Sequence, residues 1–275
     1  MAALGGLCIA LSSIFIKVAG TSGSTSAFWR CLFALPLLAV FAWREQASRR
    51  RVLLPLLAGV GLGLDFVLWG DAIPRIGAGI ATVLLSIQVV IVPALAFAFF
   101  AERPSRRFVL ATPVLLGGIV LAGGFAGTGT DPLSGAFAAL GAGAAFAGYL
   151  LLIRRSGAPV WSVFMATGSA FFVAAVLGFG WGTLDLTPGW RALGWMAALA
   201  VIGQVTGWLL IGAALPRMSA ATGATLMLLQ PVGAVLMGIG LLGETPGVVQ
   251  LIGCAAVLAA VCFASRRTKL TPTAD

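Results

Sequence analysis

The segment AIPRIGAGIATVLLSIQ at residues 72–88 aligns without gaps with a second segment, ALPRMSAATGATLMLLQ at residues 214–230. The match continues beyond both segments at the same offset. Five residues of the first copy therefore have an identical counterpart: Pro74, Arg75, Gln88, Glu102 and Pro104 correspond to Pro216, Arg217, Gln230, Glu244 and Pro246. Self-similarity at a fixed spacing indicates an internal repeat. The sequence therefore predicts two related halves, at residues 1–130 and 131–268, followed by a tail at 269–275.

The composition places both halves in a membrane. Of the 275 residues, 60% are hydrophobic and only 9% are charged, which is far too apolar for a soluble chain of this length. A helix needs roughly 20 apolar residues to cross the hydrocarbon layer. The apolar runs predict ten spans, at residues 2–19, 24–43, 52–72, 77–100, 107–125, 132–153, 159–180, 190–213, 219–242 and 247–264. We therefore expect an all-α integral membrane protein.

Five spans in each half would invert the second half relative to the first. Inverted repeats are typical of secondary transporters, which bind their substrate near the membrane midplane where the halves meet. The distribution of lysine and arginine sets the orientation, because cytoplasmic loops collect these residues. With both termini in the cytoplasm, the outer side holds only Lys17, Arg75 and Arg191. The inner side then holds Arg44, Arg49, Arg50, Arg51, Arg103, Arg106, Arg107, Arg154, Arg155, Arg217, Arg266, Arg267 and Lys269.

Several classes of function are disfavoured by what the sequence lacks. It has no histidine, so the commonest general base and transition-metal ligand is missing, and we expect no metal. It has no phosphate-binding loop with a Walker lysine, so ATP is not the direct driver, and no cofactor is expected. The net charge of +9 arises from short basic clusters between apolar runs, which does not indicate a nucleic-acid partner. The sequence makes no prediction of oligomeric state.

The two Pro-Arg pairs and the glutamates that end the following runs, Glu102 and Glu244, resemble those of the drug/metabolite transporter superfamily. Within it the chain is similar to the ten-span exporters whose halves are each called an EamA domain, including the aromatic amino acid exporters. A lysine closing the first run and an arginine in the second, Lys17 and Arg30, also fit this pattern. The second half has Arg154 near the place of Lys17 but no counterpart of Arg30. The resemblance implies ten helices around a central cavity, working by alternating access to export amino acids or similar metabolites.

Three residues are the clear cases of ionisable groups within the predicted spans and are functional candidates, because charge inside a membrane is costly. Asp65, Arg30 and Lys17 all fall in the outer half of their spans and are expected to form one buried cluster that gates the outer mouth or meets a substrate carboxylate. A structural ion pair with a snorkelling Lys17 is the alternative. Glu102 and Glu244 are expected to fix a loop or cap the next helix, with a gating salt bridge as the alternative.

Uncharged polar and aromatic residues provide candidates for the cavity wall. Gln88 and Gln230 occupy equivalent places in the two halves and either bind a zwitterionic solute or join helices. Gln204 and Trp208 are four residues apart and would share a face of an α-helix. The remaining cavity candidates are Trp69 and Tyr149, and the candidate hinges are Pro93 and Pro231, whose kinks could equally serve packing.

The sequence therefore predicts a secondary exporter of small metabolites, with aromatic or neutral amino acids as the favoured substrates and the bacterial inner membrane as its location. Its partners would be the small-molecule substrate and the lipid bilayer. Export of other metabolites or of drugs is the alternative. An intramembrane lipid-handling enzyme is disfavoured because such an enzyme needs a nucleophile with a base or clustered carboxylates, and the sequence has no histidine and a single mid-span acid, Asp65.

Overall fold

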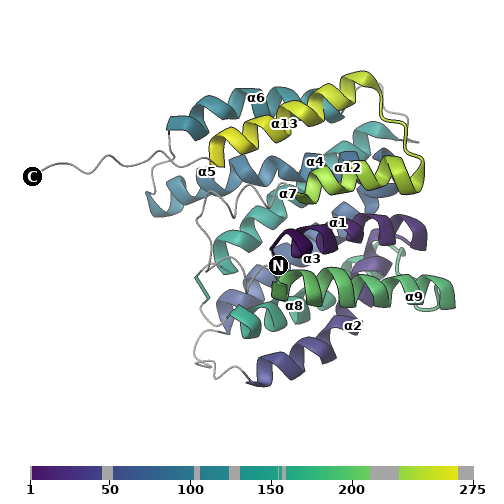
Figure 1. The fold of residues 1–275 in the computed structure, drawn as a ribbon. Coiled ribbons are helices and arrows are strands. Elements are labelled where there is room, and N and C mark those ends of the chain that lie inside the picture. Colours follow the sequence, from purple (N-terminus) through teal and green to yellow (C-terminus); the bar gives the residue numbers. More distant parts are fainter. Residues whose placement is uncertain are drawn as a thin grey trace, which may run out of the picture.

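The computed structural model describes residues 2–44, 52–101, 106–123, 131–153, 155–156, 159–210 and 229–265. Over these residues the chain forms helices that lie side by side in a bundle, and no strand occurs among them (Figure 1). In chain order they are α1 (Ala2–Ala19), α2 (Gly23–Arg44), α3 (Leu53–Ile76), α4 (Ala78–Leu84), η1 (Leu85–Ile87), α5 (Gln88–Phe100), α6 (Arg106–Gly123), α7 (Pro132–Ile153), α8 (Pro159–Gly180), α9 (Trp190–Ala198), η2 (Leu199–Gly207), α12 (Leu229–Leu242) and α13 (Val248–Ser265).

These helices coincide with the apolar runs of the sequence. Two predicted runs have the same bounds as α7 and α8, and the run predicted at 219–242 is described from residue 229 onward. Within the described ranges, six helices are long and apolar enough to cross a membrane: Gly23–Trp43, Leu53–Ile76, Ala78–Phe99, Pro132–Ile153, Val160–Gly180 and Trp190–Leu210. The all-α membrane class is therefore confirmed, while the number of ten spans and the inversion of the halves stay predictions.

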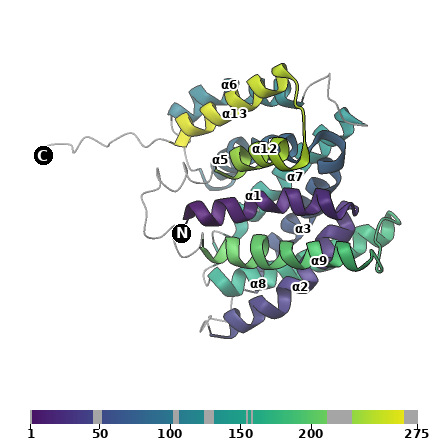
Figure 2. The same ribbon diagram turned by 45° about the vertical axis from the view of Figure 1, so that its right-hand side comes forward.

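The helix α3 is the centre of the bundle and packs on α7 and α8 through glycines. A side chain at Gly59 would place its Cβ 2.4 Å from the carbonyl oxygen of Ala166 on α8. At Gly61 the Cβ would lie 2.7 Å from the carbonyl oxygen of Ala145 on α7. Glycine therefore lets these backbones approach closely, as is common between membrane helices. The pair α6 and α13 lies at one edge of the bundle and α2 at the opposite edge (Figures 1 and 2).

The Pro-Arg pair of the first repeat lies in the last turn of α3 and not in a loop after it. The sequence predicted a span ending at residue 72, whereas the helix continues to Ile76. The proline removes the backbone donor that would bond to the carbonyl oxygen of Gly70, four residues earlier. The turn follows at Gly77, whose φ of 89° is readily adopted by glycine alone, and α4 begins directly after it.

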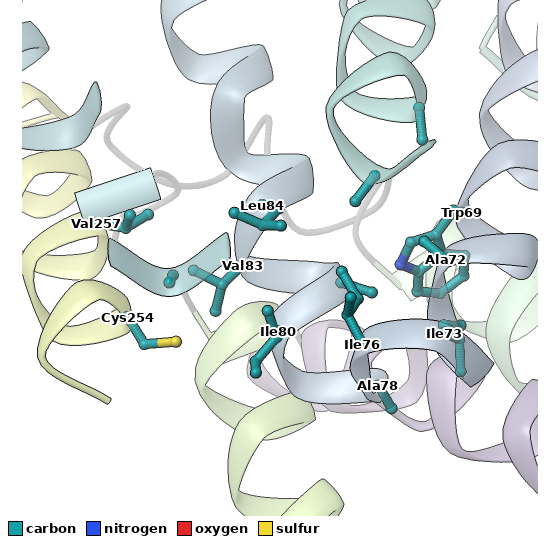
Figure 3. Close-up of a cluster of buried hydrophobic side chains, with 14 of the residues drawn as sticks. Trp69, Ala72, Ile73, Ile76, Ala78, Ile80, Val83, Leu84, Cys254 and Val257 are labelled. Atoms are coloured by element: carbon teal, nitrogen blue, oxygen red, sulfur yellow. The ribbon is translucent and has the colours of Figure 1, made fainter. Parts of the chain in front are cut away.

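The corner between α3 and α4 is buried in the largest apolar cluster. Figure 3 shows side chains that extend from Trp69 and Ile73 on α3, past Ile80 on α4, to Cys254 and Val257 on α13. All five are buried. The corner is thereby held in contact with a helix from the other half of the chain.

Two of the long helices change their geometry near the middle. The helix that starts as α4 tightens into the 3₁₀ turn η1 directly before Gln88, and α5 then contains Pro93. The helix that starts as α9 widens into the π-helix η2. Such departures from α geometry within a span are frequent at functional sites.

One end of the bundle collects the connection between α1 and α2, the α3–α4 corner, and the connections that follow α8 and α12 (Figure 2). Two contacts define it: the Ser22 hydroxyl donates to the carbonyl oxygen of Thr183, and Lys17 contacts Glu244. We call it the Lys17 end. The first residues of α1 and the last residues of α13 lie toward the opposite end.

Candidate functional site

A cavity of about 500 Å³ lies among the helices, with walls from both halves of the chain. Its volume falls in the range of about 300–1,000 Å³ that is usual for small-molecule sites. Its wall is mostly apolar, with a few polar side chains. The residues that line it are Ile9, Ser12, Arg30, Asp65, Phe66, Trp69, Thr82, Leu85, Ser86, Gln88, Val89, Val92, Pro93, Phe146, Leu150, Trp208, Gln230, Pro231 and Val261.

Two ionisable side chains of opposite type line the cavity. Arg30 on α2 and Asp65 on α3 are each only 4% exposed. The Arg30 guanidinium lies over the ring of Phe66, with Cζ 3.6 Å from the ring centroid. Among the described residues, Arg30 hydrogen-bonds to Gln204 and forms no ion pair with Asp65. The two side chains therefore line one cavity without direct contact.

Gln204 holds Arg30 from outside the cavity. Its Oε1 accepts from Arg30 Nε at 3.2 Å and from Arg30 Nη2 at 2.8 Å. Its Nε2 donates to the Thr167 hydroxyl at 3.2 Å. Gln204 is 1% exposed and does not line the cavity, whereas Trp208 does. Gln204 and Trp208 were expected to share a face, but Gln204 contacts Arg30 whereas Trp208 packs against Tyr149. Residues 199–207 form a π-helix.

Aromatic side chains form one wall. The Trp208 ring packs edge-on against the ring of Tyr149, with centroids 6.1 Å apart, and against the ring of Phe146. Tyr149 is 1% exposed and lies behind Phe146 and Trp208, so it supports the wall and does not line the cavity. Trp69 lines the cavity directly.

The repeat-related glutamines meet at this cavity. Gln88, at the start of α5, and Gln230, at the start of α12, both line it. The two candidate hinges, Pro93 and Pro231, line it as well. Equivalent positions of the two sequence repeats thus face the same space.

Unpartnered polar atoms gather at the cavity. Five buried atoms of its lining residues have no hydrogen-bond partner in the described part of the chain: Ser12 Oγ, Arg30 Nη1, Asp65 Oδ1, Trp69 Nε1 and Gln88 Oε1. Buried polar groups are nearly always hydrogen-bonded in folded proteins, and an exception calls for an explanation. A polar ligand or water in the cavity is the simplest source of partners.

The structure places Lys17 apart from this cavity. Lys17 follows Ser12 by five residues, which is about 7.5 Å along the axis of α1. Its Nζ lies 2.5 Å from Glu244 Oε1, in a separate pocket of about 260 Å³ at the Lys17 end. The expected cluster of Lys17, Arg30 and Asp65 is therefore not formed, because Lys17 has an acidic partner of its own.

Glu244 also caps α4. Its Oε1 accepts from the backbone N–H of Ala78 at 2.7 Å, and its Oε2 accepts from that of Gly79 at 3.3 Å. A carboxylate is well suited to this place because the first N–H groups of a helix lack partners within it. The sequence predicted that Glu244 fixes a loop or caps the next helix, α13, with a gating salt bridge as the alternative. Gln250 serves there instead, since its Oε1 accepts from the N–H of Gly247. Glu102 and Pro104 lie outside the described residues.

The arginine of the first Pro-Arg pair joins the α3–α4 corner to α7. Arg75 Nη1 donates to the Ser134 hydroxyl at 2.8 Å, and Ser134 also hydrogen-bonds to Asp131. These bonds from Ser134, with a smaller contribution from Arg75, lower the pKa of the Asp131 carboxyl. The second pair, Pro216 and Arg217, lies outside the described residues.

Residues 1–124 and 133–266 each match the model of the EamA-like transporter family. The chain belongs to this family. The superfamily resemblance seen in the Pro-Arg pairs is thereby confirmed, and it extends over nearly the whole chain.

Relatives of this EamA-like transporter include proteins named as amino acid exporters. The threonine/homoserine exporter RhtA of Salmonella typhimurium strain LT2 is 32% identical over 268 residues, which cover 92% of this chain and 88% of that protein. The protein of the same name from Escherichia coli K12 is 31% identical over 264 residues, covering 94% and 86%. A probable terminal-alkyne amino-acid exporter of Streptantibioticus cattleyicolor is 30% identical over 235 residues, covering 82% and 76%.

A solved structure described as the crystal structure of a protein shares the fold of this EamA-like transporter. It is 16% identical, with a TM-score of 0.63, and the alignment covers 97% of this chain and 99% of the other. This likeness concerns the fold alone.

Two long-range contacts of the EamA-like transporter are not evident from its sequence. The Lys17–Glu244 contact joins residues 227 positions apart, and the Arg30–Gln204 contact joins residues 174 positions apart. The repeated position of Glu244 was the only signal of the first. The placement of a charged Arg30 within a span was the signal of the second, since such a charge needs a partner.

Proposed function

We propose that this chain exports neutral amino acids across the bacterial inner membrane as a secondary transporter. The observation that best supports this proposal is the cavity of about 500 Å³. Its mostly apolar wall contains one buried basic residue, Arg30, and one buried acidic residue, Asp65. A neutral amino acid matches such a site because it carries one charge of each sign on a small body. Family membership over nearly the whole chain supports transport as the activity.

The proposal includes ten spans, of which α1, α6, α12 and α13 are shorter than the other described spans. An 18-residue helix such as α1 is about 27 Å long, close to the roughly 30 Å of the hydrocarbon core. The excess of lysine and arginine in the predicted inner loops favours both termini in the cytoplasm. The Lys17 end would then face the periplasm.

Alternating access is supported by the contact between Lys17 and Glu244. It joins α1 and the first turn of α4 to the segment after α12, and so to the second half of the chain. The cavity lies on the other side of this contact, toward the opposite end of the bundle. We propose that the contact closes the periplasmic mouth while the cavity faces the cytoplasm, and that it breaks when the substrate leaves.

Threonine and homoserine are the first substrates to test, because two relatives of similar length are exporters of these compounds. Aromatic amino acids are the second candidate. The observation that favours them is the wall formed by Phe66, Trp69, Phe146 and Trp208, which offers flat apolar surfaces.

Counterflow into proteoliposomes tests the proposal. Vesicles containing the purified protein are loaded with unlabelled threonine, and entry of labelled threonine or phenylalanine is followed with and without a pH gradient. We expect entry at least ten-fold faster than into protein-free vesicles for one of the two. If neither moves, and homoserine does not exchange either, the amino acid proposal is wrong. Movement of a cationic drug alone would favour drug efflux.

A further inference from the structure

We infer that Arg30 and Asp65 bind the two charged groups of the substrate: Arg30 binds the α-carboxylate and Asp65 binds the α-ammonium group. The inference rests on the proposed function and specifies its substrate class, α-amino acids with both groups free. It assigns Gln204 as a positioning residue that does not touch the substrate.

The geometry of Arg30 leaves one edge of its guanidinium for a ligand. Nε and Nη2, which form one edge, both donate to Gln204 Oε1. Nη1 has no partner in the described part of the chain, and Arg30 lines the cavity. The second edge, formed by Nη1 and Nη2, is the one that binds a carboxylate through two parallel hydrogen bonds. The Phe66 ring, 3.6 Å from Cζ, fixes the plane of the guanidinium.

Asp65 provides the complementary acceptor. It lies on α3 with 4% exposure, and its Oδ1 has no hydrogen-bond partner in the described part of the chain. An uncompensated carboxylate inside a protein is costly. Because Arg30 is engaged by Gln204 and not by Asp65, a ligand that brings its own cation satisfies Asp65 without taking Arg30 from its partner. An ammonium group with three donors is such a cation.

Gln204 sets the direction of the Arg30 fork. The guanidinium only donates hydrogen bonds, so it requires the amide oxygen of Gln204 to face it. The amide nitrogen then points to Thr167, whose hydroxyl accepts at 3.2 Å. Gln204 is on η2 and Thr167 on α8, and both are buried. The position of the carboxylate site is thereby fixed by two helices of the second half, although Arg30 belongs to the first.

Competition in the counterflow assay tests the carboxylate and the ammonium group of the substrate separately. Entry of labelled threonine is inhibited with threonine itself, with threoninamide, which lacks the carboxylate, and with N-acetylthreonine, which lacks the ammonium group. A hydrogen-bonded charge contributes about 1.5–3 kcal/mol. We therefore expect each analogue to inhibit at least ten-fold more weakly than threonine in the wild-type protein.

Two variants then show which residue binds the carboxylate and which binds the ammonium group. Arg30→Gln should abolish the preference for threonine over threoninamide and keep the preference over N-acetylthreonine. Asp65→Asn should do the reverse. Arg75→Gln removes a charge at the Lys17 end and should keep both preferences. If Arg30→Gln does not fold, Arg30→Lys keeps the charge without the fork and should reduce the threonine-to-threoninamide ratio by at least three-fold.

A purely structural role for the pair predicts a different result. Both variants would then weaken all three ligands by the same factor and leave both preferences intact, which would overturn the inference while the amino acid proposal survives. Failure of the wild-type protein to exchange any amino acid would instead remove the proposed function. Equal inhibition by threonine and both analogues in the wild type would also overturn the inference.

Discussion

Glu244 binds the ammonium group of Lys17 and the first two backbone N–H groups of α4 with one carboxylate. Lys17 is on the last turn of α1, and Glu244 follows α12, so the contact ties three segments together at one end of the bundle. The side chain of Glu244 is 14% exposed and that of Lys17 is 31% exposed. Partial burial reduces screening by solvent, which makes such a contact stronger than a surface ion pair.

Replacing Glu244 by glutamine should open the Lys17 end. The amide keeps an acceptor for one N–H but loses its charge, and hydrogen bonds to charged groups contribute about 1.5–3 kcal/mol. Cys254 reports the opening because it lines the same pocket and is only 4% exposed. In a background with alanine at the other three cysteines, we expect a membrane-impermeant maleimide to label Cys254 about ten-fold faster in Glu244→Gln.

One further variant should show the same effect, and a second serves as the control. Lys17→Met removes the other member of the ion pair and should shift the labelling rate in the same direction. Arg75→Gln removes a charge from the same pocket whose partner is Ser134, and should label at the parental rate. Equal labelling of the parent and Glu244→Gln would show that the contact does not close this end.

Gly238 on α12 should matter for the same reason. An alanine Cβ at this position would lie 2.5 Å from Glu244 Oε2, which is too close for the carboxylate to keep its place. Gly238→Ala should therefore accelerate the labelling of Cys254 as Glu244→Gln does. The effects should not add in the double variant, since both act on one contact. Gly240→Ala is the matched control, because nothing lies within 4 Å of its Cβ. Additive effects would contradict the shared cause.

The sequence predicts where along a span a residue lies better than it predicts which neighbours its side chain contacts. Apolar runs end where the chain leaves the hydrocarbon, so the bounds of α7 and α8 follow from hydropathy. The repeat alignment likewise brought Gln88 and Gln230 to equivalent places, and both line the cavity. The sequence offered a gating salt bridge at Glu244 only as an alternative and did not name Lys17 as its partner, because residues of similar depth can face different neighbours.

The second difference concerns Gln204. Gln204 was expected on the cavity face from its four-residue spacing to Trp208. It lies on the π-helix η2 and accepts from Arg30 instead. No residue in the sequence of η2, LAVIGQVTG, predicts a π-helix. The bond that Gln204 forms is a tertiary contact with a buried arginine 174 positions away, and such a contact is not encoded locally.

Pro93 should affect movement more than binding. A proline lacks the N–H that would bond to the carbonyl of Val89, four residues earlier, and both residues line the cavity. Pro93→Ala supplies that donor and stiffens α5. We expect the maximal rate of threonine counterflow to fall several-fold, while the concentration for half-maximal rate changes less than two-fold. Pro113→Ala, in α6 and away from the cavity lining, is the control. A change in apparent affinity alone would argue against a hinge.

Thr167 should influence the substrate without touching it. Its hydroxyl accepts a hydrogen bond from Gln204 Nε2. Thr167 is fully buried and does not line the cavity. Thr167→Val keeps the shape of the side chain but removes the acceptor, which leaves Gln204 able to turn away from Arg30. Loss of one neutral hydrogen bond costs about 0.5–1.5 kcal/mol, so the half-saturating concentration of threonine should rise by about two- to ten-fold. The threonine-to-threoninamide preference should fall, whereas the preference over N-acetylthreonine should persist. Thr167→Ser retains the hydroxyl and should behave as the parent. A valine variant that loses both preferences equally would show that Thr167 serves packing and does not position Arg30.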